Sequence, residues 1–188
     1  IAFSCNGKFF ASTHGDHTVK VFRYPEGDQV AYLDGHPRTP WTVRFHPKDP
    51  NILATGCLGS EVRIWDHTTG RCIRKHTFLA SISCVSFSPD GTLLAVTSGR
   101  SLLLWEWTVA NPDLNRVTSH ENFARDIRQS SGLRGSGSSD GRMSNPAASD
   151  AQGIPHELLH DEHPYHMVDF HPSGMMLMTG VKNKYGTH

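Results

Sequence analysis

The sequence has no excess of charge of either sign, because lysine plus arginine and aspartate plus glutamate number 18 each in 188 residues. Proteins that bind nucleic acid or an anionic membrane by electrostatics carry a basic surface, so this balance argues against both kinds of partner. No apolar run approaches the roughly 18 residues that a membrane-spanning helix requires. The composition therefore predicts a globular domain that binds no nucleic acid and does not cross a membrane.

Cysteine is also scarce, and the four that occur (Cys5, Cys57, Cys72 and Cys84) are scattered without a C-x-x-C pair. Three of them lie inside apolar runs, which predicts reduced core cysteines in an intracellular protein. We expect a cytoplasmic location, with the nucleus as a second one. The chain begins at Ile1 inside an expected strand, so a targeting sequence upstream of it stays an open alternative.

A repeated pair of strands is the most informative feature that the sequence does contain. Each copy has a short apolar strand ending in Phe, a turn of Pro, Asn, Asp, Ser or Gly, and a second apolar strand, which is typical of a β-hairpin. Phe3 and Phe45 are 42 residues apart, Phe45 and Phe87 are 42 apart, and Phe87 and Phe170 are 83 apart. The four copies are IAFSCNGKFFAS from Ile1, VRFHPKDPNILAT from Val43, VSFSPDGTLLAV from Val85 and VDFHPSGMMLMT from Val168.

A third strand follows each of the first three hairpins, at 17–22, 60–66 and 101–107, and weaker fourth strands follow at 29–33 and 71–75. Four strands per period of about 42 residues, with a Gly-His pair at Gly35-His36 and a Trp-Asp pair at Trp65-Asp66, predict propeller blades of the WD-repeat type. The fold class is therefore all-β, a partial WD-repeat β-propeller of about three and a half four-stranded blades. The alternative is an antiparallel sandwich whose hairpins resemble one another by accident.

The predicted organisation has three parts: blades 1 to 3 at 1–109, an insertion at 110–164, and the start of a fourth blade at 165–188. Three and a half blades cannot close a ring, so we expect the chain to be a piece of a larger propeller. Residues 130–153 have almost no large apolar side chains, which predicts a disordered segment. We expect the insertion to lie between blades, after a last strand of blade 3 near 115–120. It is either a regulatory or docking loop, or a tolerated surface insertion.

Six residues are predicted to hold the blades together. WD repeats commonly carry an aspartate in the turn before the third strand, hydrogen-bonded to the Gly-His histidine and to the tryptophan. Gly59 and Gly99 stand at that place in the second and third repeats, so we expect the polar network to be incomplete. The six residues are Asp16, His36, Trp65, Asp66, His76 and Trp105.

A short motif near the end of the chain matches the H-E-x-x-H pattern of zinc proteases, at His156, Glu157 and His160. On a helix the two histidines would lie one turn apart and could bind zinc together. Glu157 would then be placed to deprotonate a metal-bound water, and His166 could be a third ligand. A zinc metalloprotease is thus a remote alternative for the function.

Other residues around this motif argue against a catalytic zinc site. His163 replaces the glycine of the longer protease motif, and Pro164 prevents a helix from extending past it. A short helix at 155–161, with Pro155 in its first turn, remains compatible with the sequence. We expect no metal, no cofactor and no catalytic residues, and hence a protein that is not an enzyme.

Two stretches, GHPRTPWTVRFHP (35–47) and ILATGCLGSEVRIWD (52–66), are more specific than the general repeat. They resemble a blade of the family of the activating molecule in Beclin-regulated autophagy, and the resemblance covers roughly 1–107 and 165–182. It implies a non-catalytic scaffold, a substrate receptor that docks on the adaptor of a cullin-type ubiquitin ligase and regulates autophagy. Adaptor-binding WD proteins often carry W-D-x-R, whereas Thr68 stands here in place of the arginine. The alternative is a generic WD-repeat scaffold of another multiprotein assembly.

The residues expected to contact protein partners come from the same two stretches. We expect Trp41 to be mostly buried, because it begins a strand whose alternate residues Val43 and Phe45 point inward. The alternative is that Trp41 lies on the open face and binds a partner. The candidate partner-binding residues are Arg38, Trp41, Leu58 and Glu61.

Overall fold

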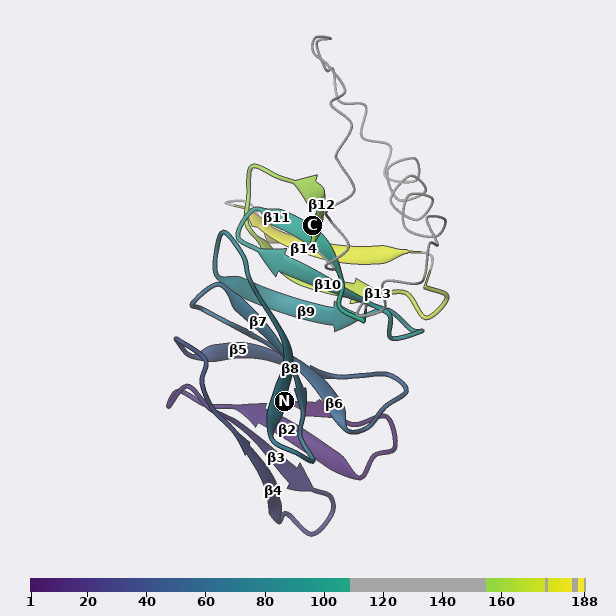
Figure 1. Cartoon of the computed structure of the whole chain (residues 1–188). Helices are drawn as coiled ribbons and strands as arrows, with labels where there is room; N and C mark the ends of the chain where they lie inside the picture. The colour runs from purple at the N-terminus through teal and green to yellow at the C-terminus, as the bar shows by residue number, and fades with distance from the viewer. Residues whose placement is uncertain (109–154, 175, 184–185, 188) are drawn as a thin grey trace, which may run out of the picture.

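The computed structural model describes residues 1–108, 155–174, 176–183 and 186–187. These residues form strands and no helix, and the strands build four antiparallel sheets (Figure 1). The all-β prediction is confirmed. The proposed disordered segment at 130–153 and the proposed strand near 115–120 lie outside the described residues.

The first two sheets each contain four strands in sequence order, joined by turns. Strands alternate inward and outward side chains, and both sheets follow the predicted hairpins closely. Sheet 1, here called blade 1, comprises β1 (Ala2–Phe3), β2 (Phe9–Thr13), β3 (Val19–Arg23) and β4 (Gln29–Leu33). Sheet 2, or blade 2, comprises β5 (Pro40–Phe45), β6 (Ile52–Cys57), β7 (Glu61–Asp66) and β8 (Arg71–Thr77).

The third sheet, blade 3, takes its last strand from beyond the predicted insertion, in the order β12-β11-β10-β9. The fourth sheet, blade 4, contains three strands in the order β13-β14-β15. Blade 3 comprises β9 (Ile82–Phe87), β10 (Leu93–Ser98), β11 (Ser101–Glu106) and β12 (His156–His160). Blade 4 comprises β13 (Tyr165–Phe170), β14 (Leu177–Asn183) and β15 (Gly186–Thr187).

Strand β12 corrects two predictions, since residues 156–160 form a strand and not a helix, and they belong to blade 3 and not to an insertion between blades. The strand runs antiparallel to β11, with Ser101 opposite His160 and Leu104 opposite His156. Leu158 is buried in the apolar cluster between blades 3 and 4. An unpaired edge of β11 would leave backbone groups without partners, and this tertiary pairing outweighs the local helical pattern.

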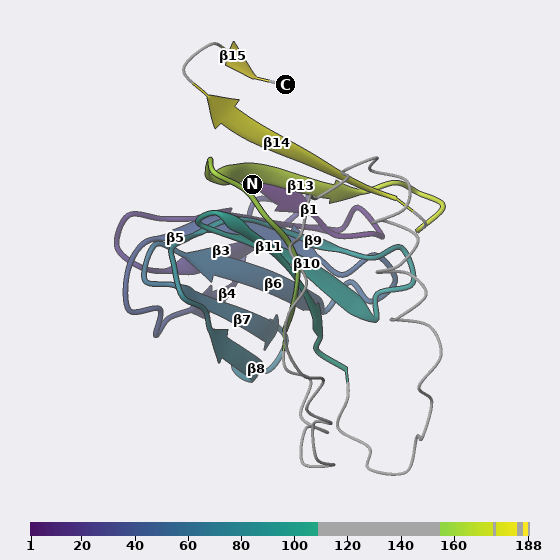
Figure 2. The ribbon, with the colours of Figure 1, turned by 90° about the horizontal axis from the view of Figure 1, so that it is seen from above.

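The blades stack face to face, and each interface has its own apolar cluster. The first strands β1, β5, β9 and β13 contact one another in series, whereas β4 and β8 lie toward the opposite edge (Figure 2). Ser86 of β9 also donates a hydrogen bond to Asp169 of β13 across 2.7 Å. Among the described residues, no helix is long and apolar enough to cross a membrane.

Candidate functional site: the second blade and its loop edge

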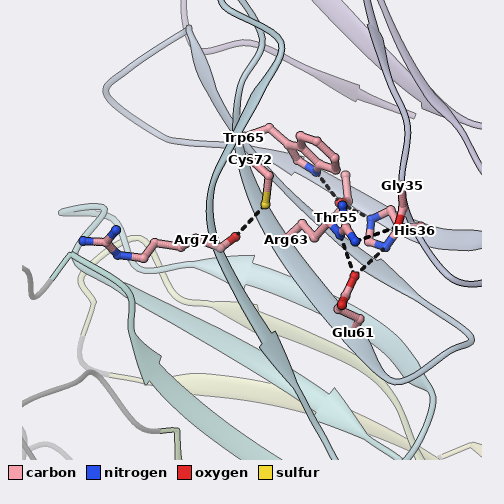
Figure 3. Close-up of polar contacts among 8 residues, drawn as sticks. All are labelled: Gly35, His36, Thr55, Glu61, Arg63, Trp65, Cys72 and Arg74. Carbon is pink, nitrogen blue, oxygen red and sulfur yellow. Dashed lines mark hydrogen bonds and ion pairs between the residues drawn. The ribbon is translucent and has the colours of Figure 1, made fainter.

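A chain of hydrogen bonds crosses the interior of blade 2 (Figure 3). The indole N–H of Trp65 donates to Thr55 Oγ1 across 2.8 Å, and that hydroxyl lies 2.6 Å from His36 Nε2. All three residues are buried. The bonds therefore tie β6 and β7 to the loop that precedes β5, and they place His36 and Trp65 in the interior of the blade.

An indole N–H can only donate, so Thr55 accepts a hydrogen bond from Trp65. A hydroxyl oxygen has two lone pairs and one proton, so the contact between Thr55 and His36 Nε2 fits either neutral tautomer of His36. The other ring nitrogen, Nδ1, is buried and has no hydrogen-bond partner among the described residues. Burial lowers the pKa of His36 to about 4, with Arg63 adding to the effect and Glu61 opposing it. His36 is therefore neutral at physiological pH.

Glu61 lies inside blade 2, not on its surface, where a partner contact would place it. Its Oε1 is 2.5 Å from Arg63 Nε and 3.9 Å from His36 Nδ1, and the residue is 8% exposed. Arg63 also donates from Nη2 to the carbonyl oxygen of Gly35 across 2.6 Å, and its guanidinium lies 5.4 Å from the centre of the Trp65 ring. Gly59 stands in this blade at the position where WD repeats commonly have an aspartate. Glu61 instead brings a carboxylate toward His36.

Gly35 is required by this arrangement for two reasons. Its φ of +107° belongs to the left-handed region, which glycine adopts at little cost. A Cβ atom at this position would also lie 2.6 Å from Arg63 Nη1. The Gly-His pair therefore combines a backbone requirement at Gly35 with a polar one at His36.

Beside this network, Cys72 of β8 points its thiol at the carbonyl oxygen of Arg74, 3.2 Å away. Burial raises the pKa of the Cys72 thiol above its ordinary value. A protonated thiol is a poor nucleophile, so Cys72 has a packing role in the blade.

Thr55 is the member of the network that the sequence did not reveal. The register aligns Thr55 of β6 with Val96 of β10, since Thr55 lies opposite Val43 and Val96 lies opposite Val85. Valine has no hydroxyl, so blade 3 cannot form the same chain of bonds. Only a ring contact joins His76 and Trp105 there, with centroids 5.9 Å apart. Valine in place of Thr or Ser at position 96 was the feature of the sequence that could have predicted the missing hydrogen bonds in blade 3.

The two predicted aspartates act in turns. Asp16 is exposed and accepts bonds from the backbone N–H and the hydroxyl of Thr18, at 3.1 and 2.6 Å. Asp66 accepts the equivalent pair from Thr68, at 2.9 and 2.6 Å. In both cases the threonine hydroxyl is the main cause that lowers the pKa of the aspartate. These bonds fix the start of β3 and the turn after β7.

Trp41 is 63% exposed, so the prediction that it is mostly buried is wrong. Pro40 pairs with Cys57 and Thr42 pairs with Gly56, which leaves Trp41 unpaired in a β-bulge. A bulge breaks the alternation of a strand and turns one side chain outward. The inward orientation of Val43 and Phe45 therefore does not predict the orientation of the Trp41 side chain.

Other exposed residues lie on the loops at the same end of blade 2. Arg38 is exposed, Leu58 is 38% exposed, and Leu79, which the sequence did not single out, is fully exposed. The backbone N–H of Leu58 donates to Thr39 at 3.0 Å, and that of Phe78 donates to Ser60 at 2.7 Å. We call this surface the loop edge, and it consists of Arg38, Trp41, Leu58 and Leu79.

Residues 1–23, 27–66 and 70–106 match the family described as WD domain, G-beta repeat. The first segment covers β1, β2 and β3 of blade 1, the second covers β4 and then β5, β6 and β7 of blade 2, and the third covers β8 and then β9, β10 and β11 of blade 3. Each of the last two matched segments therefore begins with the last strand of one blade and continues with the first three strands of the next. The chain belongs to the WD-repeat family.

Two kinds of curated protein are similar to this chain, among others. Activating molecule in BECN1-regulated autophagy proteins 1A and 1B of Danio rerio are each 37% identical over 112 residues, which is 60% of this chain. The chain spans only 8% of the length of either protein. Eukaryotic translation initiation factor 3 subunit I of Emericella nidulans is 27% identical over 202 aligned residues, covering 98% of this chain and 59% of that protein.

Proposed function

We propose that this WD-repeat chain is part of a non-catalytic scaffold that binds protein partners in the regulation of autophagy. The observation that carries the proposal is the 37% identity to the two Danio rerio autophagy proteins. The loop edge supports a binding role, because it exposes a tryptophan and two leucines beside an arginine. Tryptophan and arginine are the residues most often found at the energetic centre of protein interfaces.

A more specific form of the proposal is a substrate receptor of a cullin-type ubiquitin ligase in the cytoplasm. Thr68 stands where an arginine would complete W-D-x-R, and its hydroxyl is bonded to Asp66. Adaptor docking through that motif is therefore not part of the proposal. The adaptor would have to bind to another surface of the protein.

A non-catalytic role also agrees with the position of the H-E-x-x-H residues. His156 and His160 lie on the edge strand β12, where the one-turn spacing of a helical zinc site does not exist. Glu157 and Ser101 both lie near His160, and the contacts of both with the ring involve its Nδ1 atom. A catalytic relay needs two different ring nitrogens, one toward the nucleophile and one toward the acid.

A second candidate is a scaffold subunit of another multiprotein assembly, which the 98% coverage by translation initiation factor 3 subunit I favours. Affinity purification of the tagged protein from cells that express it, followed by quantitative mass spectrometry, separates the two. We expect a cullin-ligase adaptor and autophagy proteins to be enriched over a matched tag control. Enrichment of translation initiation factor 3 subunits in their place would contradict the autophagy proposal and support the second candidate.

A further inference from the structure

We propose that the loop edge binds a linear peptide segment of a partner protein, with an acidic side chain facing Arg38 and large apolar side chains facing Trp41, Leu58 and Leu79. This inference rests on the proposed function, because it specifies the chemistry of one partner of the scaffold. The proposed occupant is a peptide in an extended form. The alternative occupant is a second copy of this chain, and the test below distinguishes the two.

The exposure of Trp41 is the first observation behind this inference. Its neighbours Pro40 and Thr42 are buried and paired, so the bulge turns only the tryptophan outward. Its indole N–H and its ring have no partner among the described residues. An exposed indole that keeps a free donor can bury a large apolar area and still bond a peptide carbonyl.

The second observation is the order of the loops. Bonds from Leu58 to Thr39 and from Phe78 to Ser60 hold three loop segments side by side, in the order 38–41, 58–60 and 78–80. The backbone segments that carry the loop edge therefore follow one another in a series, with the segment of Arg38 and Trp41 at one end and that of Leu79 at the other. A surface that is ordered before binding loses little entropy when a peptide settles on it.

The third observation concerns charge. The stem of Arg38 packs on Gly59, where a Cβ atom would lie 3.3 Å from Arg38 Cγ. No carboxylate pairs with its guanidinium among the described residues, whereas the guanidinium of Arg63 is paired with Glu61 and bonded to Gly35. An unpaired guanidinium is complementary to a carboxylate.

These charges also indicate which class of partner fits. Binding to a nucleic-acid backbone uses several lysine and arginine contacts to successive phosphates. The loop edge offers a single arginine among three apolar side chains. An acidic residue followed by apolar residues, as found in linear protein motifs, matches both the number and the order of these groups.

The test is a selection of phage-displayed random short peptides on the chain, immobilised at low density so that copies do not meet. We expect the enriched peptides to share an acidic residue followed by large apolar residues. Synthetic versions of these peptides are then titrated by a surface biosensor. Trp41→Ala should weaken binding on the order of 30-fold, as at an interface hot spot. Arg38→Glu should weaken it roughly fivefold.

Matched controls separate a specific site from a general loss of folding. Tyr24→Ala removes another exposed aromatic ring and Arg71→Glu reverses another exposed charge, both at the opposite ends of the strands from the loop edge, and neither should change binding. A peptide whose acidic residue is replaced by lysine should bind the Arg38→Glu variant better than it binds the native chain. Structural damage alone cannot produce that exchange of preference.

Several outcomes would overturn the inference. Enriched peptides that are basic or uncharged would do so, and so would peptides that bind Trp41→Ala and Arg38→Glu as tightly as the native chain. The same holds if no peptide is enriched, or if the chain binds only its own second copy through these residues. If acidic peptides bind as expected while autophagy and ligase proteins do not copurify, the proposed function fails and the inference stands.

Discussion

Blades 1 and 2 carry the same row of side chains on the same face, yet one row is partly exposed and the other is buried. In blade 2 the row is Phe45, Leu53 and Trp65, which are 8%, 0% and 2% exposed and lie opposite one another in the strand register. In blade 1 the row is Phe3, Phe10 and Phe22, paired in the same way, and Phe3 is 59% exposed.

The difference arises from what covers each row. Ala11, Val19 and Val21 of blade 1 pack over the row of blade 2 and bury it. In blade 1 the rings contact one another, with Phe10 and Phe22 stacked at 5.1 Å and Phe3 tilted against Phe10 at 5.8 Å. A blade thus acquires its core from the small aliphatic side chains of the preceding blade, and stability is distributed over interfaces.

The largest effect is expected when the buried row is truncated. Trp65→Ala should lower the free energy of unfolding by about 3–5 kcal/mol, since it creates a cavity and leaves Thr55 without its donor. Phe22→Ala in the partly exposed row should lower it by only about 1 kcal/mol. Denaturant titrations of both variants measure the two losses. Equal losses would show that the two rows are equally buried and would break the comparison.

The pH dependence of stability should come in part from the polar network that blade 2 has and blade 1 lacks. The unfolded chain binds a proton at His36 near its ordinary pKa of 6.5, whereas in the folded chain the pKa is lowered to about 4, chiefly by burial. The contribution of His36 is therefore complete above pH 6.5 and is lost as the pH falls toward 4, up to roughly 3 kcal/mol.

Denaturant titrations across that pH range check this expectation, with His36→Gln as the variant that cannot titrate. The variant should lose less stability than the native chain between pH 6.5 and 4. Some dependence should remain, since burial also lowers the pKa of His46 and His67. Parallel curves for the variant and the native chain would mean that His36 does not titrate in this way.

The exposed row of blade 1 should affect association more than stability. Phe3→Ser should change the free energy of unfolding by about 1 kcal/mol or less, because the ring already contacts solvent. It should reduce self-association of the chain, since exposed contiguous apolar surface promotes contacts between copies. Light scattering over a concentration series compares it with Phe45→Ser, which should unfold the chain and increase association. Unchanged association of Phe3→Ser would argue that the row is not a contact surface.

The smallest effect on stability is expected at Trp41, in contrast to Trp65 of the same blade. Trp41→Ala should change the free energy of unfolding by about 0.5 kcal/mol or less, because the side chain has little to lose on unfolding. Thermal and denaturant unfolding both measure it. A loss of several kcal/mol would restore the interpretation that Trp41 belongs to the core.

Much of the fold follows from the sequence because strand alternation and turn residues are local signals. The hairpins around Phe3, Phe45 and Phe87 and the strands that contain Trp65 and Trp105 lie where the period of about 42 residues places them. Residues 156–160 were assigned wrongly because their partner strand lies more than fifty residues earlier. Only the pairing with β11 determines their conformation.

The candidate site was less predictable, because its main features depend on register. The outward turn of Trp41 results from a bulge that no single residue announces. Glu61 looked like a surface carboxylate, and only the positions of Arg63 and His36 show that it is interior. Leu79 was missed because its exposure depends on the burial of its neighbour Phe78. That burial results from tertiary packing, which the local sequence does not show.

The central claim is that each blade buries its aromatic row under the preceding blade and that, among the described residues, no blade covers the row of blade 1. Hydroxyl-radical footprinting with mass spectrometry, at a concentration where the chain is monomeric, measures this for every ring at once. Phe3 should be modified fastest, Phe10 and Phe22 at intermediate rates, and Phe45 and Trp65 slowest. Protection of Phe3 equal to that of Phe45 in the monomeric chain would contradict the claim.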